Sequence, residues 1–282
     1  MQFELMHLSL LVREQGDLFG RVAMRRETWL REIFSETIRF THHQDTFHYV
    51  PDPDEIDGKN GLVVGRIVRE IETKENDAPE RGAKEIVHKG WQGAFVFIDP
   101  TDHAEGQRLA LQHRDDIGKP FALTRALVQH INRKGDPKPP YEVHVGPISD
   151  ASTFWEWVEQ NETVGIVSVM FDLVTPNMFD GPENMDADMK RLRDQEKAKR
   201  VRFGLEGEDG LNLHTKPVEG LVSYTADGGG DTKAKARNKK SYNSANKIKR
   251  VQVPEPDAKD EKTRLQEILS AVKGLIFTIF KP

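Results

Sequence analysis

The sequence predicts an α+β protein of two lobes, each with a mostly antiparallel sheet and helices, closed by a C-terminal helix. Short apolar segments mix irregularly with amphipathic patterns along the 282 residues, which favours antiparallel pairing over a regular βαβ repeat. A chain of this length is expected to hold more than one lobe. The Pro- and Gly-rich segment 135–140 is typical of a boundary. We therefore expect an N-terminal lobe at 1–135 and a C-terminal lobe at 136–282.

In the first lobe, strands are expected where apolar runs end at turn residues, and helices where apolar residues recur at helical spacing. Leu30, Ile33 and Phe34 show this helical spacing. Strands are expected at 3–12, 46–50, 62–71 and 91–98, and helices at 27–37, 103–112 and 120–132. The polar residues 75–81 are expected to form a loop between two strands.

The second lobe is expected to contain the same mixture of strands and helices. Ser149 or Asp150 is a suitable N-cap for a helix that ends near residue 160. Strands are expected at 141–145, 164–174, 211–215 and 220–225, and helices at 150–160, 183–202 and 262–280. The last helix carries an apolar stripe through Leu265, Ile268, Leu269, Val272 and Ile276.

Composition limits the class of protein. Hydrophobic residues make up 37% and charged residues 31% of the chain, as in charge-rich globular proteins. The chain has no Cys, which excludes disulfides and thiolate zinc sites. It shows neither a signal peptide nor a run of apolar residues long enough for a membrane span. We expect a cytoplasmic protein without a membrane partner.

The most informative segment is 220–250, which we interpret as a basic hairpin. A strand at 221–225 would lead into a turn formed by Asp227–Gly228–Gly229–Gly230–Asp231. Lys233, Lys235, Arg237 and Lys239 then alternate, with Ala234 and Ala236 after the first two lysines. In a strand, these four cations would share one face at a spacing of about 7 Å. Such a row suits the phosphates of a polyanion.

Positive charge is concentrated although the net charge of the chain is −5. Residues 233–250 contain basic residues and no acidic ones, and 190–202 is also rich in Lys and Arg. Because the local field decides polyanion binding, the acidic total does not exclude nucleic acid. The expected phosphate contacts are Lys233, Lys235, Arg237, Lys239 and Lys240, with Lys247, Lys249, Arg250, Arg191, Lys197 and Arg202 in support.

Several alternatives remain open. The basic segment could be a solvated loop, or it could bind an acidic protein partner as an adaptor. A metal-dependent nuclease is the enzymatic alternative, with His43, Asp45, Asp99 and Asp102 as its candidate residues. No Walker, dinucleotide-binding or nucleophile-elbow motif occurs. We therefore expect no cofactor and favour a non-enzymatic protein that binds phosphates without base readout.

The late turn at 226–231, the Lys-rich stretch 234–246 and the closing helix resemble the RexA group of phage-exclusion proteins and related proteins of mobile elements. This resemblance covers about the last quarter of the chain. It implies a homodimer that binds DNA with little sequence preference and acts in antiviral defence. An apolar C-terminal tail at 274–280 is also typical of a partner surface. DNA is thus favoured over RNA as the ligand.

Overall fold

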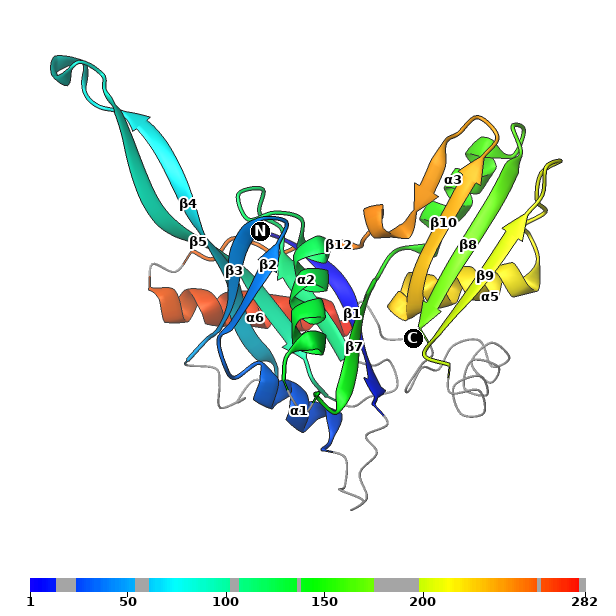
Figure 1. The fold of residues 1–282 in the computed structure, drawn as a ribbon, viewed down its shortest axis with the longest axis horizontal. Helices are drawn as coiled ribbons and strands as arrows, with labels where there is room; N and C mark the ends of the chain where they lie inside the picture. The colour runs from blue at the N-terminus through cyan, green and yellow to red at the C-terminus, as the bar shows by residue number, and fades with distance from the viewer. Residues whose placement is uncertain are drawn as a thin grey trace.

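The fold is described from a computed structural model of the chain. The structure describes residues 1–13, 24–53, 61–101, 107–135, 138–174, 198–257 and 260–278. Within them, helices pack on two antiparallel sheets, which confirms the predicted α+β class. Figure 1 shows the two sheets as the cores of two bodies.

The first body is built on an eight-stranded sheet around strand β1 (Gln2–Val12). Every residue from Phe3 to Leu11 is buried, as expected for a strand covered on both faces. The strand order is β12 (Arg250–Gln252), β1, β6 (Gln107–Gln112), β5 (Glu85–Asp99), β4 (Val63–Asn76), β3 (Asp45–Pro51) and β2 (Ile38–His42), and β7 (Tyr141–Pro147) also pairs with β1.

The side chains of β1 point alternately into two hydrophobic cores, one on each face of this sheet, and helices cover both faces. Met6 and Leu8 join the cluster under α1 (Arg26–Ile33) and α2 (Pro120–Arg133). Phe3 and Leu5 join the cluster under α6 (Glu261–Thr278), whose Leu265 lies there. The predicted helices at 27–37, 120–132 and 262–280 are thus confirmed, with shifted ends.

The predicted helix at 103–112 is wrong where the structure describes it, because residues 107–112 form β6 between β1 and β5. Leu109 and Leu111 point to the α2 side, and Ala110 points to the α6 side. A short segment buried on both faces has no period that separates strand from helix. Residues 102–106 lie outside the described part.

Strands β4 and β5 are longer than predicted and form a two-stranded arm that stands clear of the body (Figure 1). Their pairing continues without a break to Asn76↔Glu85. The predicted loop at 75–81 therefore shrinks to a turn around a short 3-10 helix, Pro79–Arg81. Cross-strand ion pairs, such as that between Lys89 and Glu72 at 2.9 Å, line the arm.

The second body is inserted between two strands of the first. The chain leaves the first sheet after β7, and an isolated bridge, Ser149↔Ile248, joins the outgoing and returning segments. β12 and α6 then rejoin the first body. The predicted boundary at 135/136 is therefore wrong, since β7, which follows the Pro-rich segment, pairs with β1 in the first sheet. The second body corresponds to about residues 150–247.

The second sheet has the order β11 (Ser241–Asn243), β10 (Gly230–Ala236), β8 (Ile166–Val174) and β9 (Arg200–Glu206). Helices α3 (Ala151–Asn161) and α5 (Lys216–Tyr224) cover one of its faces (Figure 1). Phe154 of α3 and Leu221 of α5 share a buried cluster with Val169 and Phe171 of β8. Among the residues that the structure describes, no helix covers the opposite face, which we call the outer face.

Sequence reasoning mistook several elements of this body. The strand predicted at 211–215 is wrong because these residues form no strand. The strand predicted at 220–225 is wrong because Lys216–Tyr224 is the helix α5. Val218, Leu221 and Val222 are buried at helical spacing on the inner sheet face, so packing overrides their β propensity. Of the helix predicted at 183–202, residues 183–197 lie outside the described part and 200–206 form β9.

The predicted hairpin turn instead lies where the two bodies meet. It forms η2 (Thr225–Gly229), a π-helical turn between α5 and β10. Gly228 has a φ of +90°, and a Cβ on it would lie 2.4 Å from Cβ of His7 in β1. A Cβ on Gly146 of β7 would lie 2.1 Å from the Gly228 carbonyl oxygen. Close backbone approach between the bodies therefore requires glycine at this junction.

Gly228→Ala is expected to lower the free energy of unfolding by about 2 kcal/mol or more, because a left-handed backbone and a steric clash act together. Gly82→Ala is the matched control: its φ is +82°, but nothing lies within 4 Å of the added Cβ. Urea unfolding of both variants measures the difference. Equal losses would contradict a tight junction at Gly228.

Candidate nucleic-acid interface

Lys233 and Lys235 lie on the outer face of the second sheet. Along β10, both lysines are exposed, whereas Ala234 and Ala236 are buried. This confirms the predicted alternation for this part of the basic segment. Residues at every second position of a strand are about 7 Å apart on one face. β10 therefore presents two cations to solvent at a fixed spacing.

The cross-strand neighbours of these lysines are uncharged. Lys233 pairs with Met170 of β8 and with Asn243 of β11. Lys235 pairs with Ser168 and Ser241 on the same two strands. Neither lysine forms an ion pair with any residue that the structure describes. Their charges therefore remain available to an anion from solvent.

The predicted row of four alternating cations is wrong beyond Lys235, because the chain turns after Ala236. Arg237 lies in this turn, and its guanidinium donates a hydrogen bond to the Glu208 carbonyl oxygen at 2.6 Å. Lys239 has a φ of +68° at the turn. Lys239 and Lys240 are exposed, but they belong to the turn and not to the regular row.

The supporting cations near the end of the segment have different surroundings. Lys247 is exposed directly after η3 (Ser244–Asn246). Lys249 has reached the first body, where its N–H donates to the Ile148 carbonyl oxygen at 2.7 Å. Arg250 pairs with the buried carboxylate of Glu4 at 2.9 Å. This ion pair contradicts a role for Arg250 as a phosphate contact, because its charge is already neutralised.

Ion pairing also reduces the predicted contribution of the 190–202 segment to phosphate binding. Arg202 lies on β9, and its Nε is 3.3 Å from the Asp172 carboxylate. Arg200 pairs with the same carboxylate at 2.9 Å. Arg202 is therefore not a free phosphate contact. Arg191 and Lys197 lie outside the described residues.

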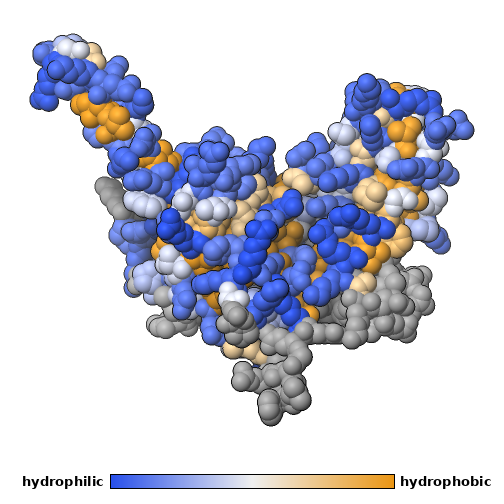
Figure 2. Space-filling model, in the orientation of Figure 1, coloured by the Kyte–Doolittle hydropathy of each residue, from blue (hydrophilic) through white to orange (hydrophobic). Residues whose placement is uncertain are grey.

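A cleft separates the outer face from the first body. Its volume is about 240 Å³, and it runs between the outer face on one side and α2 with β7 on the other. Figure 2 shows the surface hollowed between the two bodies. The charged or titratable side chains that line the cleft are Arg125, Glu142, His144, Asp172, Arg200 and Asp231. Asp231 shares its face of β10 with Lys233 and Lys235, and of these three side chains only Asp231 lines the cleft.

Two groups in the cleft have pKa values shifted toward their neutral forms. Burial raises the pKa of Asp231, and the nearby Arg125 and Lys233 oppose this shift. Oδ1 of Asp231 has no hydrogen-bond partner among the described residues. Burial likewise lowers the pKa of His144, although Glu142 opposes the shift with Oε1 3.2 Å from Nε2. Burial therefore disfavours the charged forms of these two side chains.

Asp231→Asn is expected to raise the free energy of unfolding at neutral pH. A carboxyl whose pKa is higher in the folded state binds more protons when folded, so it lowers stability as pH rises from its unfolded value of 3.8 through the raised folded value. An asparagine side chain does not ionise, so it avoids this loss of stability. The gain should therefore be largest near neutral pH and shrink toward acid.

Urea unfolding across pH measures this gain, with the exposed Asp209→Asn as the control of equal charge change. A gain from Asp231→Asn that does not depend on pH would contradict the assignment.

The candidate residues of the nuclease alternative do not gather in the described structure. Asp45 pairs with Arg69 at 3.1 Å at the β2–β3 turn, where His43 also lies. Asp99 is buried at the end of β5 and accepts a hydrogen bond from the Thr101 N–H at 3.1 Å. Asp102 lies outside the described residues. Among those described, no three His, Asp or Glu side chains are placed to hold a metal ion.

Sequence reasoning missed the residues that face the outer sheet across the cleft. Arg125 and His144 come from α2 and β7, far from β10 along the chain. No local pattern marks them, because only the junction of the two bodies brings these elements together. Asp231 was read as a turn residue, although it shares the two-residue period of Lys233 and Lys235.

Comparison of the chain with models of known families, with curated proteins and with solved structures finds no match. None of the described helices has the length and apolar character needed to cross a membrane.

Proposed function

We propose that this protein binds nucleic acid through phosphate contacts made by Lys233 and Lys235 on the outer face. DNA is the proposed ligand, since the resemblance to the RexA group implies DNA. Lys239, Lys240 and Lys247 extend the basic surface from the adjoining turns. Binding is largely independent of sequence, because contacts to phosphates position a ligand without reading its bases.

The observation that carries this proposal is the pair of exposed lysines at a regular spacing, whose cross-strand neighbours are uncharged. On a chain with a net charge of −5, much of the surface repels a polyanion, so such a face concentrates attraction locally. Arg125, exposed on α2 across the cleft, adds a cation on the opposite side.

The double variant Lys233→Glu/Lys235→Glu is expected to bind duplex DNA at least tenfold more weakly, to a similar extent for unrelated sequences. Loss of two phosphate contacts should also make the plot of log affinity against log salt shallower by about 2. Fluorescence anisotropy of labelled duplexes across a salt series measures both quantities.

The matched control is Lys84→Glu/Lys262→Glu, which makes the same charge change at exposed lysines in the arm and in α6. It should retain most of the affinity and the original salt slope. Equal losses in the two double variants would indicate a general effect of net charge. Unchanged duplex affinity after reversal of Lys233 and Lys235 would instead favour an acidic protein as the partner of this face.

Two further parts of the proposal extend beyond this face. A homodimer would present two outer faces to one duplex, and the resemblance implies a role in phage exclusion. The apolar tail on which the dimer was predicted lies largely outside the described side chains. Light scattering of the purified protein measures its mass in solution and tests the dimer.

A further inference from the structure

Helix α6 covers only part of its face of the first sheet. Leu265 and Leu269 pack with Val64 of β4 and Phe97 of β5, and the helix begins at Glu261. Beyond that point, the same sheet face continues through the pairs Arg66↔Phe95, Val68↔Gly93 and Glu70↔Trp91. These residues, other than Glu70, line a groove of about 530 Å³ together with Glu261 and Arg264 of α6. This volume suits a ligand of nucleotide size.

The floor of this groove, which we call the Trp91 groove, carries two aromatic rings. Trp91 is 60% exposed, and its ring lies edge-on to that of His48 at 5.5 Å. Phe95 lies on the same face of β5 four residues later, about 14 Å from Trp91 along the strand. Gly93 lies between them, where a Cβ would be only 3.0 Å from Val68 Cγ1. Trp91 is thus an open, flat platform that suits a base of an extended strand, whereas the half-buried Phe95 lies beneath the Arg66 guanidinium.

Cations stand on the α6 side of the groove. The Arg66 guanidinium lies 4.7 Å from the centre of the Phe95 ring and pairs with Glu261 at 2.7 Å. The Glu261 side chain is 77% exposed, so this ion pair contributes little stability and a phosphate can replace the carboxylate. Arg264 is exposed one turn further along α6, without an ion pair among the described residues.

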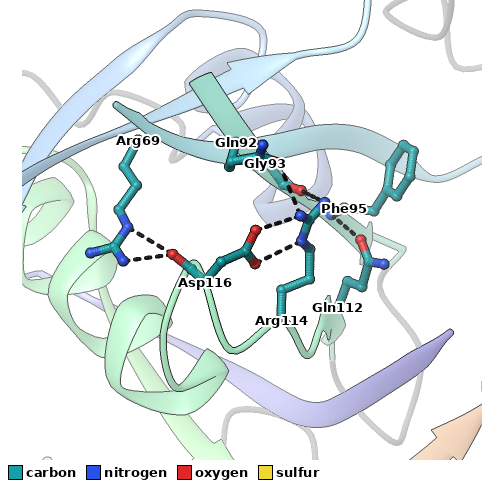
Figure 3. Close-up of polar contacts among 7 residues, drawn as sticks. All are labelled: Arg69, Gln92, Gly93, Phe95, Gln112, Arg114 and Asp116. Atoms are coloured by element: carbon teal, nitrogen blue, oxygen red, sulfur yellow. Dashed lines mark hydrogen bonds and ion pairs between the residues drawn. The ribbon is translucent and has the colours of Figure 1, made fainter. Parts of the chain in front are cut away.

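A hydrogen-bonded network holds the remaining wall of the groove (Figure 3). Arg114 binds the Asp116 carboxylate through Nε and Nη2 at 2.9 and 2.5 Å and donates to Gln92 Oε1 at 3.0 Å. This contact lowers the pKa of Asp116 and neutralises Arg114. Gln112 Oε1 accepts from the Phe95 N–H at 3.2 Å. The side-chain amide groups of Gln92 and Gln112 thus keep their N–H donors for a ligand.

We propose that the Trp91 groove binds single-stranded nucleic acid, with a base stacked on Trp91 and phosphates held by Arg66 and Arg264. A duplex does not present the faces of its bases, whereas a single strand does. Glu70 lies directly opposite Trp91 and repels phosphate. The sugar–phosphate backbone therefore runs along the α6 side. This inference takes its ligand class from the proposed function but uses a separate surface.

Tryptophan fluorescence tests the groove directly. Trp29 is buried and Trp155 and Trp157 are partly buried, so Trp91 is the tryptophan that a ligand reaches most easily. Oligothymidylate is expected to quench the fluorescence of the wild-type protein, and Trp91→Phe is expected to abolish most of this quenching. Trp91→Ala should weaken oligothymidylate binding about tenfold, the effect of losing one stacked base, and should leave duplex affinity unchanged.

The Lys233→Glu/Lys235→Glu variant separates the two proposals. It should lose duplex affinity and retain quenching by oligothymidylate. Thymidine monophosphate is a further probe: weak quenching by the nucleotide and strong quenching by the oligomer indicate a strand site, whereas equal affinities contradict it. Full oligothymidylate affinity in Trp91→Ala, with circular dichroism showing a folded protein, overturns the groove and leaves the lysine face standing. The exposed ring would then fit a protein partner better.

Discussion

The backbone of Leu5 in strand β1 determines how the two bodies are joined. Its carbonyl oxygen accepts a hydrogen bond from Ile148 at 3.2 Å, and its N–H donates to Lys249 at 3.1 Å. The outgoing and returning segments of the second body are therefore attached to one residue of the first sheet, and Ile148 and Lys249 also bond to each other at 2.7 Å. Such a double attachment restricts the movement of the second body relative to the first far more than a single linker would. The glycine contact between Gly228 and His7 completes it.

This attachment gives the outer face its surroundings. Because the second sheet is held beside β7, its outer face meets α2 across a cleft, while α3 and α5 occupy the other face. Within the cleft, burial raises the pKa of Asp231 and lowers the pKa of His144, which disfavours the charged form of each. Further along β10, Lys233 and Lys235 are exposed and unpaired within the described structure. The fold thus leaves two accessible cations on the face of β10 whose Asp231 end borders the cleft.

Local features were predictable from the sequence and long-range ones were not. The alternation of Lys233 to Ala236, the helix at 120–132 and the Asp150 cap follow from short-range patterns that the structure retains. β6 and α5 were mistaken because burial on both faces and packing on a sheet hide or override the local period. In the candidate site, the two lysines were predictable. The neutralisation of Arg250 by Glu4, 246 residues away in the chain, depends on strand pairing that no local pattern encodes.

Site-directed photo-crosslinking tests most directly the proposal that nucleic acid binds the outer face of the second sheet. The chain has no Cys, so one introduced cysteine carries the crosslinker at a single position. Ser241→Cys places it on the outer face opposite Lys235, whereas Gln160→Cys places it on the exposed side of α3. We predict that labelled duplex DNA is captured from position 241 and not from position 160. Equal capture from both positions, or capture from position 160 alone, would contradict the account.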